Sequence, residues 1–200
     1  DSIQDGDRIM CTIRNAVAGS AGAVEGMVEG AGRMYESPCV WGMKQLMTRA
    51  YEGVGLSPGL VSYMECHATG TYVGDVLELQ AIGEVLGKAR GVKGGDDVQG
   101  LLRVASVKSN IGHAEVSAGL FSLAKVIEML RRRVYLPTAG VTTPRTDFDW
   151  QGHNMRVIQE TEPFGPVEST LPVLMGVNSF GIGGSYSHVI VEEYRPPAAL

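Results

Sequence analysis

The chain has 200 residues, of which 44% are hydrophobic and 20% are charged, a balance typical of a folded globular protein rather than a disordered one. The formal net charge of −5 argues against nucleic acid as a partner, because phosphate binding needs a basic surface. The sequence has no apolar run of about eighteen residues and no basic leader ahead of an apolar stretch, so we expect neither a membrane span nor a signal peptide.

The first predicted element is a strand at residues 8–14, where polar and apolar residues alternate. A glycine-rich surface loop is expected at residues 19–32. Ser37 and Pro38 then have the pattern of a helix N-cap and a first helical residue. Apolar residues follow at helical spacing, and Gly55 is placed to end that helix.

A second strand is predicted at residues 61–66, and it leads into a small, glycine-containing loop at residues 67–71. Asp75 can cap the next helix, and Glu78, three residues later, completes the pattern of a capping box. Residues 91–100 are polar and glycine-rich, which indicates a solvent-exposed loop.

A third strand is predicted at residues 101–107 and is followed directly by Lys108. A loop that contains Gly112 and His113 leads to a helix over residues 115–132. Helical spacing predicts that its apolar face consists of Val116, Leu120, Leu123, Ala124, Ile127 and Leu130.

Residues 137–172 show little periodicity, apart from a short strand expected at residues 155–159. Two strands close the chain, at residues 173–178 and 188–193, and a tight glycine turn at residues 180–184 lies between them. The alternation of strands and helices along the whole chain is typical of an α/β fold.

Two of the four histidines, His67 and His113, occupy equivalent positions, each just past the end of a predicted strand. Ligands bind at that edge of open α/β sheets, so both rings and Lys108 reach one crevice if the two strands are parallel neighbours. A lone histidine at a strand end is more often structural, but two in equivalent loops favour a functional site. A helix N-terminus lowers the pKa of a nearby histidine, and a neutral imidazole can donate a hydrogen bond to a developing oxyanion.

Two other kinds of site fit the residues less well. The glycines at residues 181–184 precede a strand, whereas a phosphate-binding glycine loop opens a helix. Cys39, Cys66 and His67 lack the paired spacing of zinc ligands, so we expect no metal site.

Three motifs resemble the signatures of β-ketoacyl synthases, in the order that this family has them. Residues 65–71 (ECHATGT) resemble the His-Gly-Thr-Gly-Thr signature, and residues 107–113 (VKSNIGH) match the second signature. Residues 178–184 (NSFGIGG), ahead of His188, look like the third. The resemblance covers nearly the whole chain and is closest to type I polyketide synthases.

The resemblance implies a thiolase-like fold, which has two similar halves, and this chain matches only the C-terminal half. We therefore expect an α/β structure with a mixed five-stranded sheet and helices on both faces. Residues 1–195 would form the half-domain, and residues 196–200 would begin a linker. The chain begins at Asp1 and not at a methionine, as an excerpt of a longer polypeptide would.

The activity implied by the resemblance is a decarboxylative Claisen condensation of a malonyl thioester with an enzyme-bound acyl chain. His67 and His113 would donate hydrogen bonds to the thioester oxygen, on which charge accumulates. Lys108 would orient His113 and tune the local charge. These three residues are the expected catalytic residues of this chain.

The resemblance also implies four substrate-binding residues. Thr69 and Thr71 would contact the phosphopantetheine arm of an acyl carrier protein, which presents the substrate, so no cofactor is expected to bind directly. The backbone N–H of Phe180 would form part of the oxyanion hole, with its ring gating the acyl pocket and Gly181 beside it.

The nucleophilic cysteine of the family lies in the N-terminal half, and the cysteines of this chain are poor substitutes. Cys66 is next to His67, but neighbours on a strand point to opposite faces. Cys11 lies within a predicted strand, and Cys39 lies in a first helical turn, where a thiol pKa can fall. Their irregular spacing indicates reduced thiols and a cytoplasmic protein.

One departure from the family pattern bears on stability. Ala68 replaces the glycine that follows the first histidine, so the backbone is strained if this position has a positive φ.

The expected partners are the N-terminal half of the same domain, an acyl carrier protein, an acyltransferase domain and a second copy in a homodimer. We also expect an apolar surface that the N-terminal half covers. The alternative is a non-elongating ketosynthase-like subunit of the chain-length-factor type. Such relatives lose catalytic residues, so the presence of Lys108 and both histidines counts against it.

Overall fold

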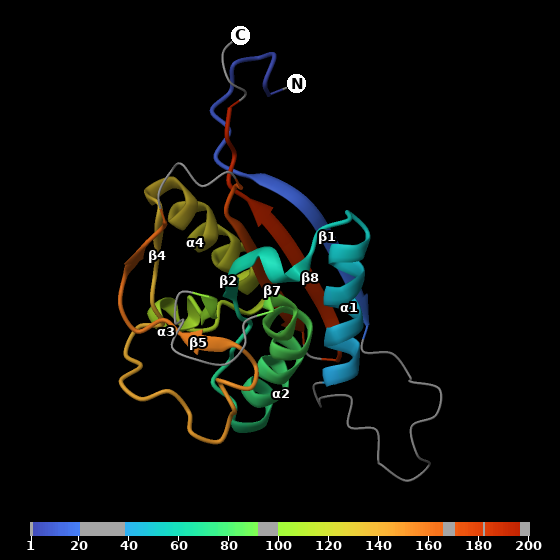
Figure 1. The fold of residues 1–200 in the computed structure, drawn as a ribbon, viewed down its shortest axis with the longest axis vertical. Coiled ribbons are helices and arrows are strands. Elements are labelled where there is room, and N and C mark those ends of the chain that lie inside the picture. Colours follow the sequence, from blue (N-terminus) through green and yellow to red (C-terminus); the bar gives the residue numbers. More distant parts are fainter. Residues whose placement is uncertain (1, 21–38, 92–99, 166–170, 182, 197–200) are drawn as a thin grey trace.

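Figure 1 shows the protein as a computed structural model, which describes residues 2–20, 39–91, 100–165, 171–181 and 183–196. Its centre is a six-stranded sheet with the strand order β1-β8-β7-β2-β3-β5. These strands are β1 (Thr12–Ser20), β2 (Val61–Glu65), β3 (Leu102–Ala105), β5 (Met155–Val157), β7 (Leu174–Gly181) and β8 (Ser185–Glu192). A separate small sheet pairs β4 (Val134–Tyr135) with β6 (Glu162–Pro163).

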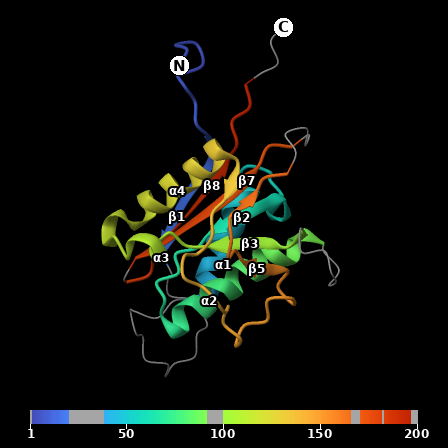
Figure 2. The ribbon, with the colours of Figure 1, turned by 90° about the vertical axis from the view of Figure 1, so that its left-hand side faces the viewer.

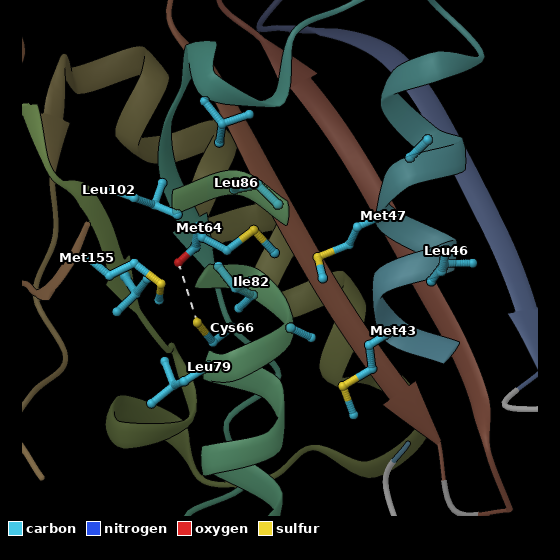
Figure 3. Close-up of a cluster of buried hydrophobic side chains, with 14 of the residues drawn as sticks. Met43, Leu46, Met47, Met64, Cys66, Leu79, Ile82, Leu86, Leu102 and Met155 are labelled. Atoms are coloured by element: carbon cyan, nitrogen blue, oxygen red, sulfur yellow. Dashed lines mark hydrogen bonds between the residues drawn. The ribbon is translucent and has the colours of Figure 1, made fainter. Parts of the chain in front are cut away.

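Helices cover both faces of the large sheet, as predicted. They are α1 (Val40–Glu52), α2 (Tyr72–Ile82), α3 (Lys108–Ile111) and α4 (Ala118–Arg132). Residues of α1 and α2 pack on one face and residues of α4 on the other, which gives two hydrophobic clusters (Figure 2). In the first cluster, Met43 and Met47 of α1 and Leu79 and Ile82 of α2 lie over Met64 of β2 (Figure 3). Burial of these large apolar side chains holds the layers together.

The large sheet is mixed, as expected, but it has six strands where five were predicted. Strands β2, β3, β5 and β7 are parallel, whereas β8 runs antiparallel to β7 and to β1. The additional strand is β5, which falls within the expected segment 155–159 and pairs with the edge of β3. The short strand expected there is present, over Met155–Val157, but it was not counted among the strands of the main sheet.

The first strand lies further along the chain than predicted. β1 covers Thr12–Ser20 rather than residues 8–14, so Gly19 belongs to the strand and not to a loop. Its bounds follow from its partner, because β1 pairs with β8 from Thr12 opposite Glu192 to Ser20 opposite Ser185. β1 is an edge strand, so its own hydrophobic pattern specifies its position weakly.

The start of α1 also differs from the prediction. The expected cap residues Ser37 and Pro38 lie outside the described residues, and the N-cap is Cys39. Its side chain makes no capping hydrogen bond, and its backbone N–H donates to the hydroxyl of Tyr186 at 2.8 Å. A tyrosine from β8 therefore accepts the hydrogen bond from this backbone donor at the start of the helix.

The predicted apolar face of α4 is only partly right, since Leu130 is buried and Leu123 packs against the core, but other members are exposed. The buried side chains of the helix are Ala118, Ser122, Lys125, Val126, Met129 and Leu130. Of the predicted face, Leu120 is 70% exposed, and Val116, which precedes the helix, is fully exposed. The helix carries apolar residues on two sides, and periodicity alone does not tell which side meets the sheet.

Within the described residues, none of the helices combines the length and the hydropathy needed to cross a membrane.

Candidate active site

The candidate residues meet where three neighbouring parallel strands end. β2 lies between β3 and β7, with Glu65 opposite Ala105 on one side and opposite Val177 on the other. His67 follows the end of β2, Lys108 follows the end of β3, and Phe180 lies near the end of β7. The structure therefore brings the predicted segments together at one edge, the position expected for ligand binding in such sheets.

His67 is half-buried, and both its backbone and its ring are fixed by hydrogen bonds. Its backbone N–H donates to Glu78 Oε1 at 2.7 Å, and its ring Nδ1 accepts the backbone N–H of Phe180 at 3.2 Å. Burial, then the charge of Lys108, then His113 lower the pKa of His67 to about 4. The prediction of a lowered pKa is confirmed, although burial and a cation cause it rather than a helix N-terminus.

His113 faces the first histidine from the other loop. The two ring centroids are 5.6 Å apart, with an angle of 83° between the ring planes. Its Nδ1 accepts the backbone N–H of Glu115 at 2.9 Å. The backbone of Glu115 therefore helps to orient this ring.

Both rings use Nδ1 as a hydrogen-bond acceptor, and this assigns their tautomer. A neutral imidazole that accepts at Nδ1 carries its proton on Nε2. His67 and His113 thus each have one N–H left with which to donate to a third group. Two such donors, side by side, suit an oxygen on which negative charge develops.

Lys108 opens α3, directly after the third strand, in a short helix that the sequence analysis did not predict. With Ala68 and Glu78 it lines a cavity of about 380 Å³ beside the loop after β2. Burial lowers the pKa of Lys108, and the carboxylates of Glu78 and Glu65 oppose this effect. Its charge is close enough to His67 to lower the pKa of that ring.

Glu78 is part of the site, although the sequence analysis assigned it to a capping box. The cap of α2 is Thr71, and no side-chain capping bond is made there. The buried carboxylate of Glu78 instead accepts the backbone N–H groups of His67 and Ala68, at 2.7 and 2.8 Å. Although its spacing from Asp75 resembles a capping box, Glu78 therefore holds the loop that precedes the helix and does not cap the helix.

A chain of buried side chains extends from Glu78 to α1. Asn178 donates to Glu78 Oε1 at 3.0 Å and accepts from His188 Nδ1 at 2.7 Å. The other ring nitrogen of His188 lies 3.0 Å from the hydroxyl of Tyr51. Burial lowers the pKa of His188 to about 3, so this histidine is a neutral, structural member of the chain.

The two threonines of the loop are exposed and close together. Their Oγ1 atoms are 3.3 Å apart, and Thr69 lines the 380 Å³ cavity. Thr71 lines a second, open hollow of about 510 Å³ together with Arg145. Gly70 between them has φ +79° and donates its N–H to Asp75, which holds the loop in place.

Phe180 contacts His67 through both its backbone and its ring. The ring centroids are 5.4 Å apart, and Tyr186 packs against the other side of Phe180 at 4.8 Å. The N–H of Phe180 was expected to face a substrate oxygen, but in this structure it donates to His67. At Gly181, the last residue of β7, an added Cβ would contact the Ser185 hydroxyl, which would have to move aside.

A non-glycine residue with a positive φ lies one residue after His67 and two residues after His113. Ala68 has φ 31° and Glu115 has φ 49°. Left-handed backbone in residues other than glycine is strained and tends to occur at functional sites. The strain expected at Ala68 is therefore present.

Two of the three cysteines, Cys66 and Cys11, do not offer a nucleophile. The side chain of Cys66 points away from the loop into the core beside Leu79, with Sγ 3.8 Å from the carbonyl oxygen of Met64 (Figure 3). Burial raises the pKa of Cys66 well above its ordinary value. Burial also raises the pKa of Cys11, which precedes β1. Both residues are therefore protonated thiols at neutral pH.

Comparison with known families gives two matches that together cover most of the chain. The model described as "Beta-ketoacyl synthase, C-terminal domain" matches residues 18–142. The model described as "Ketoacyl-synthetase C-terminal extension" matches residues 144–199.

Similar proteins and structures agree with these matches. A reducing polyketide synthase of Fusarium langsethiae is 39% identical over 96% of this chain. A highly reducing polyketide synthase of Gibberella fujikuroi is 36% identical over 98% of it. The ketosynthase from module 6 of the bacillaene synthase of Bacillus subtilis 168 superimposes with a TM-score of 0.83 and 29% identity over 98% of this chain.

The chain corresponds to a small part of these proteins. It spans 8% and 7% of the two fungal proteins and 32% of the solved ketosynthase.

Proposed function

This chain belongs to the β-ketoacyl synthase family, as its C-terminal part, and we propose that it supplies the two-histidine side of a polyketide synthase condensing site. The reaction is an acyl transfer, the decarboxylative Claisen condensation of a malonyl thioester with an enzyme-bound acyl chain. The observation that carries the proposal is the pair of imidazoles, 5.6 Å apart, that both present an N–H at Nε2.

The chemistry needs those donors in its first step. The bond between the malonyl carboxylate and the α-carbon breaks, carbon dioxide leaves, and the electron pair passes to the α-carbon and the thioester oxygen. Hydrogen bonds from His67 and His113 stabilise this enolate because they are in place before the charge develops. The low pKa of His67, about 4, keeps that ring neutral and able to donate at neutral pH.

The second step forms the new carbon–carbon bond. The enolate carbon attacks the carbonyl carbon of the acyl thioester, the carbon–sulfur bond breaks, and the cysteine thiolate leaves. Lys108, beside His67, disfavours protonation of that ring and offsets the negative charge of the enolate.

Four residues are proposed to bind the substrates. Thr69 and Thr71 face the open side of the loop, where their hydroxyls can meet a phosphopantetheine arm. Phe180 and Gly181 flank His67 from β7, where the Phe180 ring can limit the acyl pocket.

The nucleophilic cysteine is proposed to come from the N-terminal half of the same domain. The exposed apolar residues Ile111, Val116, Leu120 and Phe121 lie close in sequence to the exposed His113, from the end of α3 to the start of α4. An uncovered apolar surface beside a catalytic group is what a missing half would bury. An acyl carrier protein, an acyltransferase domain and a second copy of the chain complete the proposed assembly, in the cytoplasm.

Kinetics of the complete ketosynthase test the proposal. His67→Ala, His113→Ala and Lys108→Ala should each lower the decarboxylation of a malonyl thioester by about a hundredfold or more, because each removes charge stabilisation from the transition state. Lys88→Ala is the control and should leave the rate unchanged, because Lys88 is an exposed lysine that does not line the 380 Å³ cavity.

The outcomes separate the alternatives. Wild-type protein that decarboxylates malonyl thioester but forms no condensation product would support the non-elongating subunit. Variants of His67 and His113 that retain the wild-type rate would overturn the assignment of the site.

A further inference from the structure

The three proposed catalytic residues lie in three different segments of the chain. His67 follows β2, Lys108 opens α3 after β3, and His113 precedes α4. Their mutual geometry therefore depends on what fixes β2, the turn at Val107 and α4 relative to one another.

One buried carboxylate contacts all three of these segments. Glu65 is the last residue of β2 and is 0% exposed. Its Oε1 accepts the backbone N–H of Val107, the residue before Lys108. Its Oε2 accepts the hydroxyl proton of Tyr63 and lies 2.9 Å from Nζ of Lys125, in the second turn of α4.

The ion pair of Glu65 and Lys125 is fully enclosed, with side-chain exposures of 0% and 6%. Burial raises the pKa of Glu65, and the charge of Lys125 is the main effect that opposes it. Removing two charges from water costs about as much as their attraction returns, so such a pair is a weak source of stability. A pair of apolar residues would fill the same space between β2 and α4.

We propose that Glu65 is a positioning residue, which holds the turn at Val107 against β2 and α4 and thereby keeps Lys108 in register with both histidines. The inference rests on the proposed function, because its effect is on the same reaction. Glu78 has a different place, since it binds the loop after β2 and not the turn after β3.

Removing Glu65 alone would leave Lys125 as an unpaired buried charge, so the test uses neutral pairs in the complete ketosynthase. Glu65→Gln/Lys125→Met keeps a side-chain oxygen that can accept from Val107, whereas Glu65→Leu/Lys125→Met removes it. We expect the melting temperature of both to stay close to that of the wild type. For malonyl decarboxylation we expect kcat within about threefold for the Gln variant and a loss of tenfold or more for the Leu variant, with KM unchanged in both.

A second route removes the same hydrogen bond from its other side. Val107 has φ −66°, which proline can adopt, and Val107→Pro deletes the N–H while Glu65 stays in place. It should lower kcat about as much as the Leu variant. This variant decides the question if the Leu variant does not fold.

The matched control removes an ion pair of β3, the strand that precedes Lys108. Arg103 of β3 pairs with Glu162 at 2.9 Å, and neither residue adjoins a proposed catalytic residue in the chain. Arg103→Met/Glu162→Leu should change kcat by less than about twofold.

The inference is overturned if the Leu variant and Val107→Pro fold and decarboxylate as fast as the Gln variant. A purely structural role would also make kcat follow the melting temperature across the series. If the wild-type ketosynthase shows no decarboxylation, the proposed function fails instead, and the two results are therefore distinguishable.

Discussion

The charge of the His67 ring is set by its neighbours. Burial is the largest cause of its low pKa, and the next is Lys108, whose positive charge disfavours a second positive charge on the ring. A pKa of about 4 keeps the ring neutral across the physiological range.

Lys108→Ala should therefore raise the pKa of His67, because the nearby cation is lost while the burial remains. NMR titration of the ring protons measures the change directly and does not depend on activity. In the kinetics, the range in which the ring is neutral should begin at a higher pH. Lys88→Ala should leave the titration of His67 unchanged, and an unchanged or lower pKa in Lys108→Ala would contradict the geometry.

Ala68→Gly should stabilise the protein by about 0.5–1 kcal/mol, because glycine adopts a positive φ without the Cβ clash that alanine suffers. The same change at Ala81, inside α2, should destabilise it by about 1 kcal/mol, since glycine weakens a helix. Urea unfolding of the two variants measures both effects. A loss of stability in Ala68→Gly would show that its φ of 31° carries no strain.

At this scale the sequence predicted which residues meet but not how each one is oriented. His67, Lys108 and His113 follow strand ends, and parallel neighbours bring strand ends together. Glu78 was missed because its spacing from Asp75 fits a capping box equally well, and the spacing does not tell where the carboxylate points. Glu65 is hidden similarly, since a charged residue inside a strand shows no partner in the sequence.

Among the elements, the turn of π-helix at Gly83–Gly87 packs against the segment that precedes β5. Asn154 donates to the carbonyl oxygen of Gly87 at 3.2 Å, and a Cβ added at Gly87 would overlap the carbonyl oxygen of His153. The contact fixes the segment that leads into β5 and therefore the edge of the sheet.

Gly87→Ala should destabilise the protein by about 1–3 kcal/mol, because the atom that it strikes belongs to the backbone and cannot move aside cheaply. Gly165→Ala places a methyl group where no atom lies within 4 Å and should change the stability by less than about 0.5 kcal/mol. Guanidinium unfolding compares the two. Equal free energies of unfolding for the two variants would mean that the backbone before β5 can move away from the added methyl group without destabilising the protein.

The bounds of the central, buried strands were predicted well, whereas the position of the edge strand and the buried side of α4 were predicted poorly. β2 and β3 have central positions and near-continuous apolar runs, and their predicted and observed bounds agree to within two residues. β1 is an edge strand and was placed too early. α4 has two apolar sides, and part of the side that was expected to be buried, including Leu120, is exposed.

For the whole molecule, the apolar side of α4 predicts how the chain behaves alone. Leu120 is 70% exposed and Phe121 is 47% exposed, beside the exposed His113. Residues 1–200 alone should bind a hydrophobic dye or self-associate, because exposed apolar surface drives both.

Leu120→Glu should reduce dye binding by the isolated chain, yet it should destabilise the complete ketosynthase, where we propose that the N-terminal half covers this side. Leu60→Glu is the control, since Leu60 is 48% exposed but precedes β2, outside α3 and α4. It should have a small effect in both. If Leu120→Glu is harmless in the complete enzyme, this surface is not the one that the other half covers.

The fold class and the mixed sheet were predictable because the alternation of strands and helices indicates an α/β fold and the order of the motifs indicates the family. The short strand at residues 155–159 was expected too, but its membership of the main sheet was not, since that depends on the pairing of β5 with β3.

The antiparallel pairing of β1 with β8 also determines how the chain would respond to force. Thr12 lies opposite Glu192, so the polypeptide enters β1 and leaves β8 at the same end of the pair (Figure 1). Tension applied to these two ends loads the hydrogen bonds one after another, as in opening a zipper, and not all together in shear. The edge strand would peel away first at low force, while the strands that carry the histidines remain paired. In a long polypeptide under strain, this edge would be the mechanically weak side of the unit.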